Sequence, residues 1–201
     1  MTNAADIDDH PVVVGITGAS GSLIALHTID ALLDSGVPVV ACASSAARIV
    51  WKQEMAESFG EALERWADSG IFSYHPASEI AAPIASGTFS TRGMALAPCS
   101  MATVAAVSQG LADNLIRRAA DVTIKERRPL VIIPRESPLS VIHLENLTRL
   151  ARLGATIIPP EPAFYLRQQT IADIAEYAAQ RALLALGVIS ELPEGMRYGE
   201  G

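Results

Sequence analysis

A short apolar run at 130–133 (LVII) is bounded by a proline on each side. A run this short and this apolar is typical of a buried parallel strand, because a buried helix needs about ten residues or more. Arg135 and Glu136 follow the run, so they are predicted to lie at the carboxyl end of the strand, where open α/β sheets bind ligands. Residues 117–135 also hold six of the 15 Lys and Arg residues of a chain whose net charge is -7. Such a concentration of positive charge in an acidic protein predicts a site for a small anion.

The N-terminal part of the chain has a strand–helix–strand order. An apolar run at 11–14 leads into the loop GITGASG at 15–21. Apolar residues then recur at helical spacing up to Gly36, where a helix is expected to end. A second apolar run fills 37–42. This order implies a parallel sheet with right-handed crossovers.

Further elements are expected along the rest of the chain. Helices are predicted at 54–66, from Asp113 to about 124, at 139–153 and from Thr170 to about 186, and strands at 71–74, 94–98, 130–134 and 156–158. Residues 78–90 are rich in Ala, Ser, Pro and Gly and are expected to form a loop. The pattern predicts one α/β domain at 11–190, a three-layer Rossmann-like parallel sheet flanked by helices, with a disordered N-terminal tail at 1–10 and a C-terminal tail at 191–201.

Charge, hydropathy and cysteine content exclude several classes of function. A net charge of -7 argues against a nucleic-acid surface. No apolar run approaches the ~18 residues of a membrane span, and the polar start MTNAADIDDH argues against a signal peptide. Cys42 and Cys99 are too few for a disulfide framework or a Cys-rich metal site, and the four histidines show no metal-ligand spacing. We therefore expect a cytoplasmic protein that binds no nucleic acid, no membrane and no metal.

The first glycine loop has the spacing G-x-x-G-x-x-G, not the dinucleotide fingerprint G-x-G-x-x-G. The segment CASS at 42–45, after the second strand, lacks the acidic residue that would bind a ribose. Nicotinamide dinucleotides are therefore disfavoured, and Ser22 stands where a nucleophile elbow needs glycine. Two interpretations remain: a tight turn that needs glycine, or a loop whose backbone N–H groups and Ser20 face a ligand at a helix N-terminus.

Hydroxyl side chains follow three of the predicted strands. They are Thr17 and Ser20 after the first strand, Ser44 and Ser45 after the second, and Ser100 and Thr103 after the strand at 94–98. Each of them alone is an ordinary helix cap. If the three strands are neighbours, the hydroxyls meet at one edge of the sheet. They would then suit a phosphorylated, polyhydroxylated ligand such as FMN.

Two arginines, Arg118 and Arg181, lie on otherwise apolar helix faces. Arginines near a helix terminus often do no more than extend their charged ends to water. Together with the other cations of residues 117–135, these two favour an anion pocket or a subunit interface. Arg117, on the other side of its helix, is expected to pair with Asp121 at i+4.

At these motifs the sequence resembles the UbiX/Pad family of flavin prenyltransferases. The matching segments are GITGASG at 15–21, SSAAR at 44–48, APCSMAT at 97–103, DNLIRRAADVTIKERRPLVIIPRESPL at 113–139 and HLENLTRLARLGATIIPPEPAFY at 143–165. The resemblance implies a flavodoxin-like Rossmann fold and an enzyme that joins the dimethylallyl group of dimethylallyl phosphate to N5 and C6 of reduced FMN, without a metal. It also implies a homododecamer with sites built between subunits, and a UbiD-type decarboxylase that receives the prenylated FMN.

The resemblance also implies roles for individual residues. It places against FMN the residues Gly18, Ala19, Ser20, Ser44, Ser100, Met101, Ala102, Thr103 and Arg135. Around the dimethylallyl phosphate it places Ser86, Arg118, Lys125, Glu136, Tyr165 and Arg181. The implied catalytic set is Glu136, Ser20, Lys125 and Glu54. In this set, Glu136 and the departing phosphate are the candidates for moving protons from the flavin.

The chain departs from the family pattern at four places. Ala102 stands where Lys is common, and Gln168 stands where Pro is usual. Met55 interrupts the usual E-T-D sequence around Glu54. A Trp expected near the C-terminus is absent, and Tyr198 is the nearest aromatic residue.

Two other functions are compatible with parts of the pattern. An FMN-dependent cysteine-type decarboxylase of the related flavoprotein family would carry an active-site His and a PASANT-like segment, and neither is visible. A non-catalytic flavin-binding subunit of a decarboxylase complex is disfavoured by the intact set of Lys125, Arg135, Glu136, Tyr165 and Arg181. The sequence leaves open whether the prenyl donor is a monophosphate or a diphosphate.

Overall fold

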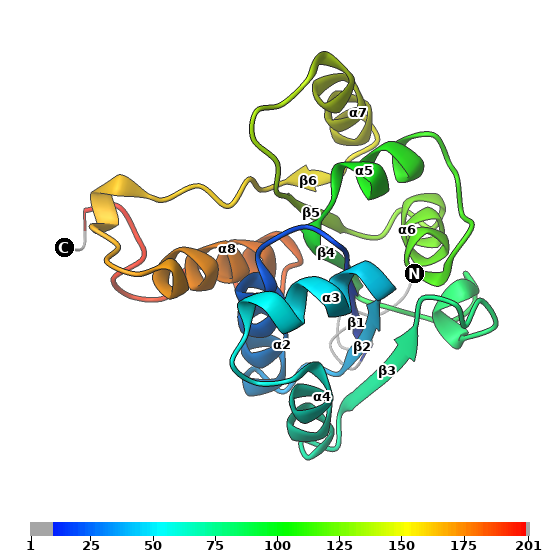
Figure 1. The fold of residues 1–201 in the computed structure, drawn as a ribbon, viewed down its shortest axis with the longest axis horizontal. Helices are drawn as coiled ribbons and strands as arrows, with labels where there is room; N and C mark the ends of the chain where they lie inside the picture. The colour runs from blue at the N-terminus through cyan, green and yellow to red at the C-terminus, as the bar shows by residue number, and fades with distance from the viewer. Residues whose placement is uncertain (1–9, 200–201) are drawn as a thin grey trace.

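The computed structural model describes residues 10–199, and its centre is a six-stranded parallel sheet (Figure 1). The strands are β1 (Val12–Ile16), β2 (Val39–Ala43), β3 (Phe72–Pro76), β4 (Gly93–Cys99), β5 (Leu130–Pro134) and β6 (Thr156–Ile157). Their order is β3-β2-β1-β4-β5-β6, so the direction of winding reverses between β1 and β4. Ligands of such doubly wound sheets bind beside this reversal, at the carboxyl ends of the strands. The predicted fold class is confirmed.

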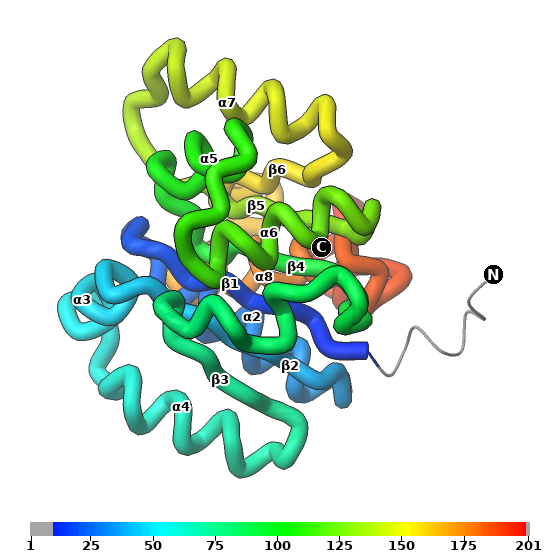
Figure 2. The backbone as a smooth tube through the Cα atoms, turned by 90° about the vertical axis from the view of Figure 1, so that its right-hand side faces the viewer, coloured from blue at the N-terminus to red at the C-terminus, as the bar shows by residue number. Residues whose placement is uncertain are grey.

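Helices cover both faces of the sheet (Figures 1 and 2). In residues 10–199 they are α2 (Ser22–Asp34), α3 (Ser45–Glu54), α4 (Phe59–Ala67), α5 (Met101–Ser108), α6 (Leu115–Lys125), α7 (Val141–Arg152) and α8 (Ile171–Ala185), with short 3-10 helices η1 (Pro83–Ala85) and η2 (Phe164–Leu166). One buried cluster packs α2, α3, α4 and α8 on one side of the sheet, and a second packs α5, α6 and α7 on the other. Helices α6 and α8 therefore lie on opposite faces.

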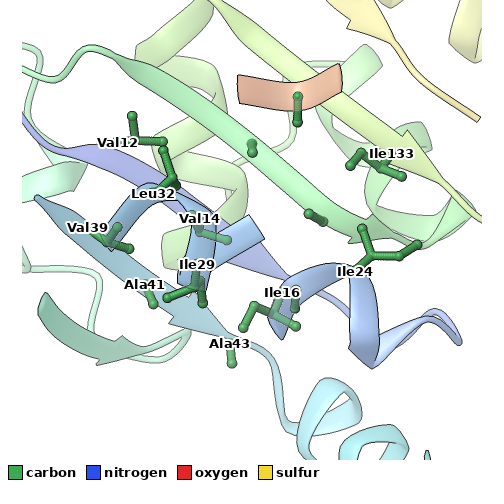
Figure 3. Close-up of a cluster of buried hydrophobic side chains, with 14 of the residues drawn as sticks. Val12, Val14, Ile16, Ile24, Ile29, Leu32, Val39, Ala41, Ala43 and Ile133 are labelled. Carbon is green, nitrogen blue, oxygen red and sulfur yellow. The ribbon is translucent and has the colours of Figure 1, made fainter. Parts of the chain in front are cut away.

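Strand β1 supplies both buried clusters, because alternate residues of a strand point to opposite faces. Val12 and Val14 pack with Ile29 and Leu32 of α2 (Figure 3), while Val13 belongs to the cluster on the other face. All residues of β1 are buried. This two-sided burial explains why the strand is an uninterrupted apolar run rather than an alternating one.

An aromatic cluster joins α3 and α4 to the β3 edge of the sheet. The ring of Trp51 meets Phe59 and Trp66 edge to face, with centroids 5.3 and 5.9 Å apart. Trp66 also contacts Phe72, and Phe59 contacts Tyr74, both from β3. Trp51 and Trp66 are fully buried. Since large buried rings tolerate little displacement, this cluster fixes α3 against the sheet.

The segment 54–66 differs from the prediction of a single helix. Helix α3 ends at Glu54 and α4 begins at Phe59. The break is a capping box: the hydroxyl of Ser58 accepts a hydrogen bond from the backbone N–H of Glu61, and the carboxylate of Glu61 accepts one from the N–H of Ser58. The prediction was wrong because an N-cap residue takes extended backbone and cannot continue a helix.

The C-terminal segment folds back beside η2 and α8 (Figure 1). Arg197 forms an ion pair with Glu191 at 3.1 Å and donates to the carbonyl of Leu192 at 2.6 Å. The next residue, Tyr198, places its ring edge to face with Tyr165, with centroids 5.5 Å apart. The tail predicted at 191–201 is thus packed against η2 as far as the structure describes it. The N-terminal tail predicted at 1–10 lies, except for its last residue, outside the described residues.

Within residues 10–199, no helix combines the length and the apolar character that crossing a membrane requires.

Candidate functional site

Strands β2, β1 and β4 are neighbours, so the three hydroxyl-bearing strand ends meet at one edge of the sheet, as predicted. We call this region the strand-end edge; it consists of Thr17, Gly18, Ala19, Ser20, Ser44, Ser100, Met101, Ala102 and Thr103. The hydroxyl of Ser44 accepts from the N–H of Ala47 at 3.1 Å and caps α3. Ser100 caps α5 in the same way through the N–H of Thr103 at 3.3 Å. Both residues therefore mark helix N-termini, which attract anions.

Thr17 has a structural role at this edge. Its buried hydroxyl donates to the carbonyl of Pro98 at 2.9 Å and accepts from the N–H of Ser100 at 2.7 Å. These bonds tie the end of β1 to the end of β4. The hydroxyl is consequently satisfied by the protein itself, whereas Ser20 in the same loop is exposed.

Gly18 lets the loop approach α3 closely. A Cβ atom built on Gly18 would lie only 2.5 Å from the Cβ of Ala46 in the first turn of α3. Contacts this short do not occur between real side chains, so even alanine would push the loop away from α3. The two interpretations of this loop, a tight turn that needs glycine and a ligand-binding loop, are therefore compatible. Gly18 lets the loop before α2 lie against the N-terminus of α3.

Glu54 reaches from the end of α3 to the start of α2. Its carboxylate accepts hydrogen bonds from the backbone N–H groups of Gly21 at 2.9 Å and Ser22 at 2.8 Å. Partial burial raises its pKa, but hydrogen bonds from Ser20, Ser22 and Gly21 outweigh that effect, and the net pKa lies below the usual glutamate value. Glu54 is thus an anion at neutral pH. Helix α2 has Gly21 at its N-cap and therefore no side-chain cap of its own. The carboxylate of Glu54 takes that role.

A pocket of about 460 Å³ opens beside Glu54. Its lining includes Ser20, Glu54 and Arg135, with apolar side chains such as Ile174 of α8. The Nε of Arg135 donates to the carbonyl of Ser20 at 3.2 Å. Three predicted site residues from three separate segments are therefore brought together.

Glu136 is exposed and its carboxylate accepts from the N–H of Ser137.

Tyr177 connects Tyr165 and Arg181, which are both predicted to contact the prenyl donor. The hydroxyls of Tyr165 and Tyr177 are 3.3 Å apart, and the Nη1 of Arg181 donates to the Tyr177 hydroxyl at 3.5 Å. With the ring of Tyr198 against Tyr165, these four residues form what we call the tyrosine cluster. The sequence analysis did not identify Tyr177 as a site residue. Its position one helical turn before Arg181, on the same face of α8, could have indicated it.

The other residues predicted to contact the prenyl donor lie at α6 and in the loop after η1. They are Ser86, Arg118 and Lys125. Arg118 donates to the carbonyl of Ala85 at 3.0 Å and pairs with Asp121 at 2.7 Å. Arg118 is half-buried rather than packed inward. The hydroxyls of Ser86 and Thr88 are 2.9 Å apart, and Lys125 forms an ion pair with Glu126.

The predicted pairing of Arg117 with Asp121 is wrong. Arg117 instead binds Asp113, at 2.7 Å, because long helical side chains lean toward the N-terminus of their helix. Asp121 is left to Arg118. The helix predicted from Asp113 also begins slightly later: Asn114 caps α6, through the N–H of Arg117 at 3.1 Å.

The predicted site residues therefore divide into groups on different faces. The tyrosine cluster belongs to η2, α8 and the C-terminal segment, and α8 packs on the α2 side of the sheet. Arg118 and Lys125 belong to α6, on the opposite side. A sheet separates the two groups, so one chain does not gather all of them around a single ligand.

The chain matches the model of the Flavoprotein family over residues 2–183. Among its relatives, the flavin prenyltransferase LpdB of Lactiplantibacillus plantarum is 48% identical over 181 residues, which cover 90% of this chain and 94% of that protein. The flavin prenyltransferase UbiX of Archaeoglobus fulgidus is 45% identical over 176 residues, covering 88% and 94%.

Two solved structures share the fold closely. A dodecameric FMN-dependent UbiX-like decarboxylase from Escherichia coli O157:H7 has a TM-score of 0.82 and 40% identity, covering 88% of this chain and 94% of that one. AnUbiX (PadA1), in complex with FMN and dimethylallyl pyrophosphate, has a TM-score of 0.83 and 38% identity, covering 89% and 93%.

This chain therefore belongs to the Flavoprotein family. Within that family, its relatives are the UbiX-type flavin prenyltransferases.

Proposed function

We propose that this protein is a flavin prenyltransferase, an enzyme that joins the dimethylallyl group of dimethylallyl phosphate to N5 and C6 of reduced FMN. The main support is the pocket of Ser20, Glu54 and Arg135, which opens beside the strand-end edge. The related proteins with similar sequences are named flavin prenyltransferases. The product would serve a UbiD-type decarboxylase, and the reaction would need no metal.

The strand-end edge fits FMN. Gly18 leaves room for α3 to approach the loop, and Ser44 and Ser100 mark the N-termini of α3 and α5. Because Glu54 already occupies the N-terminus of α2, we place the flavin phosphate toward α3 and α5 rather than α2. Reduced FMN, when bound, supplies two nucleophilic positions, N5 and C6. The residues of this edge would hold the flavin beside the pocket.

The tyrosine cluster fits the other substrate. In the reaction N5 would replace the phosphate at the allylic carbon, and the electron pair of the broken C–O bond would leave with the phosphate. The prenyl double bond would then open: one of its carbons bonds to C6 and the other takes up a proton. Tyr165 and Arg181 would donate hydrogen bonds to the phosphate oxygens and stabilise the charge of the leaving group. Glu136, exposed next to Arg135, or the released phosphate would accept the protons lost from N5 and C6.

A complete site would need a second copy of the chain. Ser86, Arg118 and Lys125 lie across the sheet from the tyrosine cluster, so another copy would have to supply them. Large exposed apolar side chains support such contacts: Val141 and Ile142 on α7, and Phe164 and Ile171 near α8, are each at least 65% exposed. We propose a closed homo-oligomer, a dodecamer as in the E. coli relative.

An anaerobic incubation with reduced FMN and dimethylallyl phosphate tests the function. We expect the flavin to gain the mass of one dimethylallyl group less one hydrogen, while an equal amount of phosphate is released. Running the same assay with the diphosphate identifies the preferred donor. A flavin of unchanged mass would contradict the proposal. Oxidation of a C-terminal cysteine peptide in a separate incubation with oxidised FMN would favour a decarboxylase.

A further inference from the structure

Tyr177 occupies the centre of the tyrosine cluster. Its hydroxyl lies 3.3 Å from that of Tyr165, twelve residues earlier in the chain, and accepts a hydrogen bond from Arg181 at 3.5 Å. Tyr177 is partly buried, whereas Tyr165 is 50% exposed and Arg181 is exposed. The most buried member of the three therefore contacts the other two.

The hydrogen-bond inventory shows what this arrangement can bind. Two phenol groups carry two O–H donors, and their mutual bond uses one of them. Arg181 has further N–H donors beyond the one directed at Tyr177. One O–H and several guanidinium N–H groups are thus left for a ligand rich in acceptors. A phosphate group has the matching oxygens and the opposite charge.

The same contacts reduce the cost of binding. Arg181 is a long side chain, and Tyr165 stands on the short helix η2, so each would lose side-chain freedom if a ligand had to order it. The hydroxyl of Tyr177 already restrains both, and the ring of Tyr198 restrains Tyr165 from its other side. The donors are therefore arranged before the ligand arrives.

We propose that Tyr177 is a positioning residue for the phosphate group of the prenyl donor, because its hydroxyl holds Tyr165 and Arg181 together so that both contact one phosphate. This inference rests on the proposed function for the identity of the ligand. Tyr177 acts through its two neighbours. The residue therefore affects donor affinity more than FMN affinity.

The variant Tyr177→Phe keeps the ring and removes only the hydroxyl. In the full-length protein we expect the KM for dimethylallyl phosphate to rise about threefold to tenfold, with FMN affinity and kcat near their normal values. Inorganic phosphate, followed by calorimetry, should bind more weakly by a similar factor. Tyr74→Phe is the matched control: its ring packs against Phe59 in the aromatic cluster at the β3 edge, so loss of its hydroxyl should leave phosphate affinity unchanged.

A spectroscopic titration tests the contact without turnover. The hydrogen bond with Tyr177, then burial, then the charge of Tyr177 raise the pKa of Tyr165, and Arg181 lowers it. Removing the Tyr177 hydroxyl should therefore shift tyrosinate formation at Tyr165 to lower pH. Tyr165→Phe identifies which transition in the ultraviolet spectrum belongs to that residue.

The outcomes separate this inference from the proposed function. If the wild-type protein forms no prenylated flavin but binds phosphate, and Tyr177→Phe weakens that binding, the positioning role stands and the proposed reaction falls. Wild-type phosphate affinity in Tyr177→Phe overturns the positioning role, as does an unshifted Tyr165 titration. Absence of phosphate binding in both proteins overturns it as well.

Discussion

The strand-end edge and the tyrosine cluster are stabilised differently. At the edge, a buried side chain and backbone groups fix the loop at 15–21, whereas the tyrosine cluster consists largely of exposed side chains. Thr17 is buried and bonds to the backbone of both Pro98 and Ser100. Tyr165 and Tyr198, by contrast, are 50% and 85% exposed and touch through their ring edges. The comparison indicates that the edge forms as part of the fold, while the cluster can be altered without loss of stability. Substitutions in the two regions should therefore fail in different assays.

The largest expected loss of stability follows Gly18→Ala. The new Cβ would lie 2.5 Å from the Cβ of Ala46, so α3 and the loop must separate. We expect the free energy of unfolding to fall by about 1–3 kcal/mol, and FMN binding to weaken as well. Urea denaturation and flavin titration measure the two effects.

Gly60→Ala is the control for this substitution. Gly60 lies in α4, and the nearest atom to a Cβ built there is 3.9 Å away. Its unfolding free energy should stay the same or rise by up to about 1 kcal/mol, because alanine favours helix more than glycine does. Equal stability of the two variants would show that the loop is not fixed by its contact with α3.

Glu54→Gln should have a smaller effect that depends on pH. The folded-state pKa of Glu54 lies below its usual value of 4.5, so its contribution to stability is present above that value. The contribution is lost as the pH falls through the folded pKa. The variant should therefore be less stable than the wild type at pH 7, and the two should converge in acid. Unfolding curves at several pH values measure this.

Glu61→Gln controls for the loss of any helix-capping carboxylate. Glu61 also has a lowered pKa, first through the hydroxyl and then through the backbone N–H of Ser58. It caps α4, away from the pocket. Both variants should lose part of the acid dependence of stability, but only Glu54→Gln should change FMN binding. An FMN affinity unaffected by Glu54→Gln would remove Glu54 from the site.

The smallest change in stability is expected for Lys125→Ala and Arg181→Ala. Both side chains are exposed, so the unfolding free energy should change by less than about 0.5 kcal/mol. Each variant alone should nevertheless lose prenyl transfer, since each lacks one part of the donor site. This combination of normal stability and lost activity distinguishes the surface groups from the strand-end edge.

Co-expression of the two variants tests whether the groups come from different copies. If each site takes Lys125 from one copy and Arg181 from another, about a quarter of the sites in a random mixed oligomer contain both residues. Activity should then return in the mixture. A mixture as inactive as its components would show that each site lies within one chain.

The sequence predicted most of the frame and part of the site. Strand β5 matches its predicted range because a proline at each end marks the limits of the apolar run. The meeting of Ser20, Ser44 and Ser100 followed from assumed strand neighbours that the topology confirms. Sequence periodicity predicted these elements because strand and helix patterns are local.

Contacts between side chains were harder to predict. Nothing in the local pattern indicates that the hydroxyls of Tyr165 and Tyr177 meet, because the contact depends on how η2 packs beside α8. Likewise, Arg117 had an acidic residue on each side at suitable spacing, and the direction of its side chain decided between them. The break between α3 and α4 required a capping box to be recognised inside an amphipathic segment.

The aromatic cluster at the β3 edge determines what can be observed optically. Trp51 and Trp66 are the only two tryptophans of the chain, and their ring centroids are 5.9 Å apart. Intrinsic tryptophan fluorescence therefore reports a single place, the packing of α3 and α4 on the sheet. Melting of that edge would change the emission, whereas rearrangement of the C-terminal segment around Tyr198 would leave it almost unchanged. The tyrosine cluster must be followed by absorbance instead.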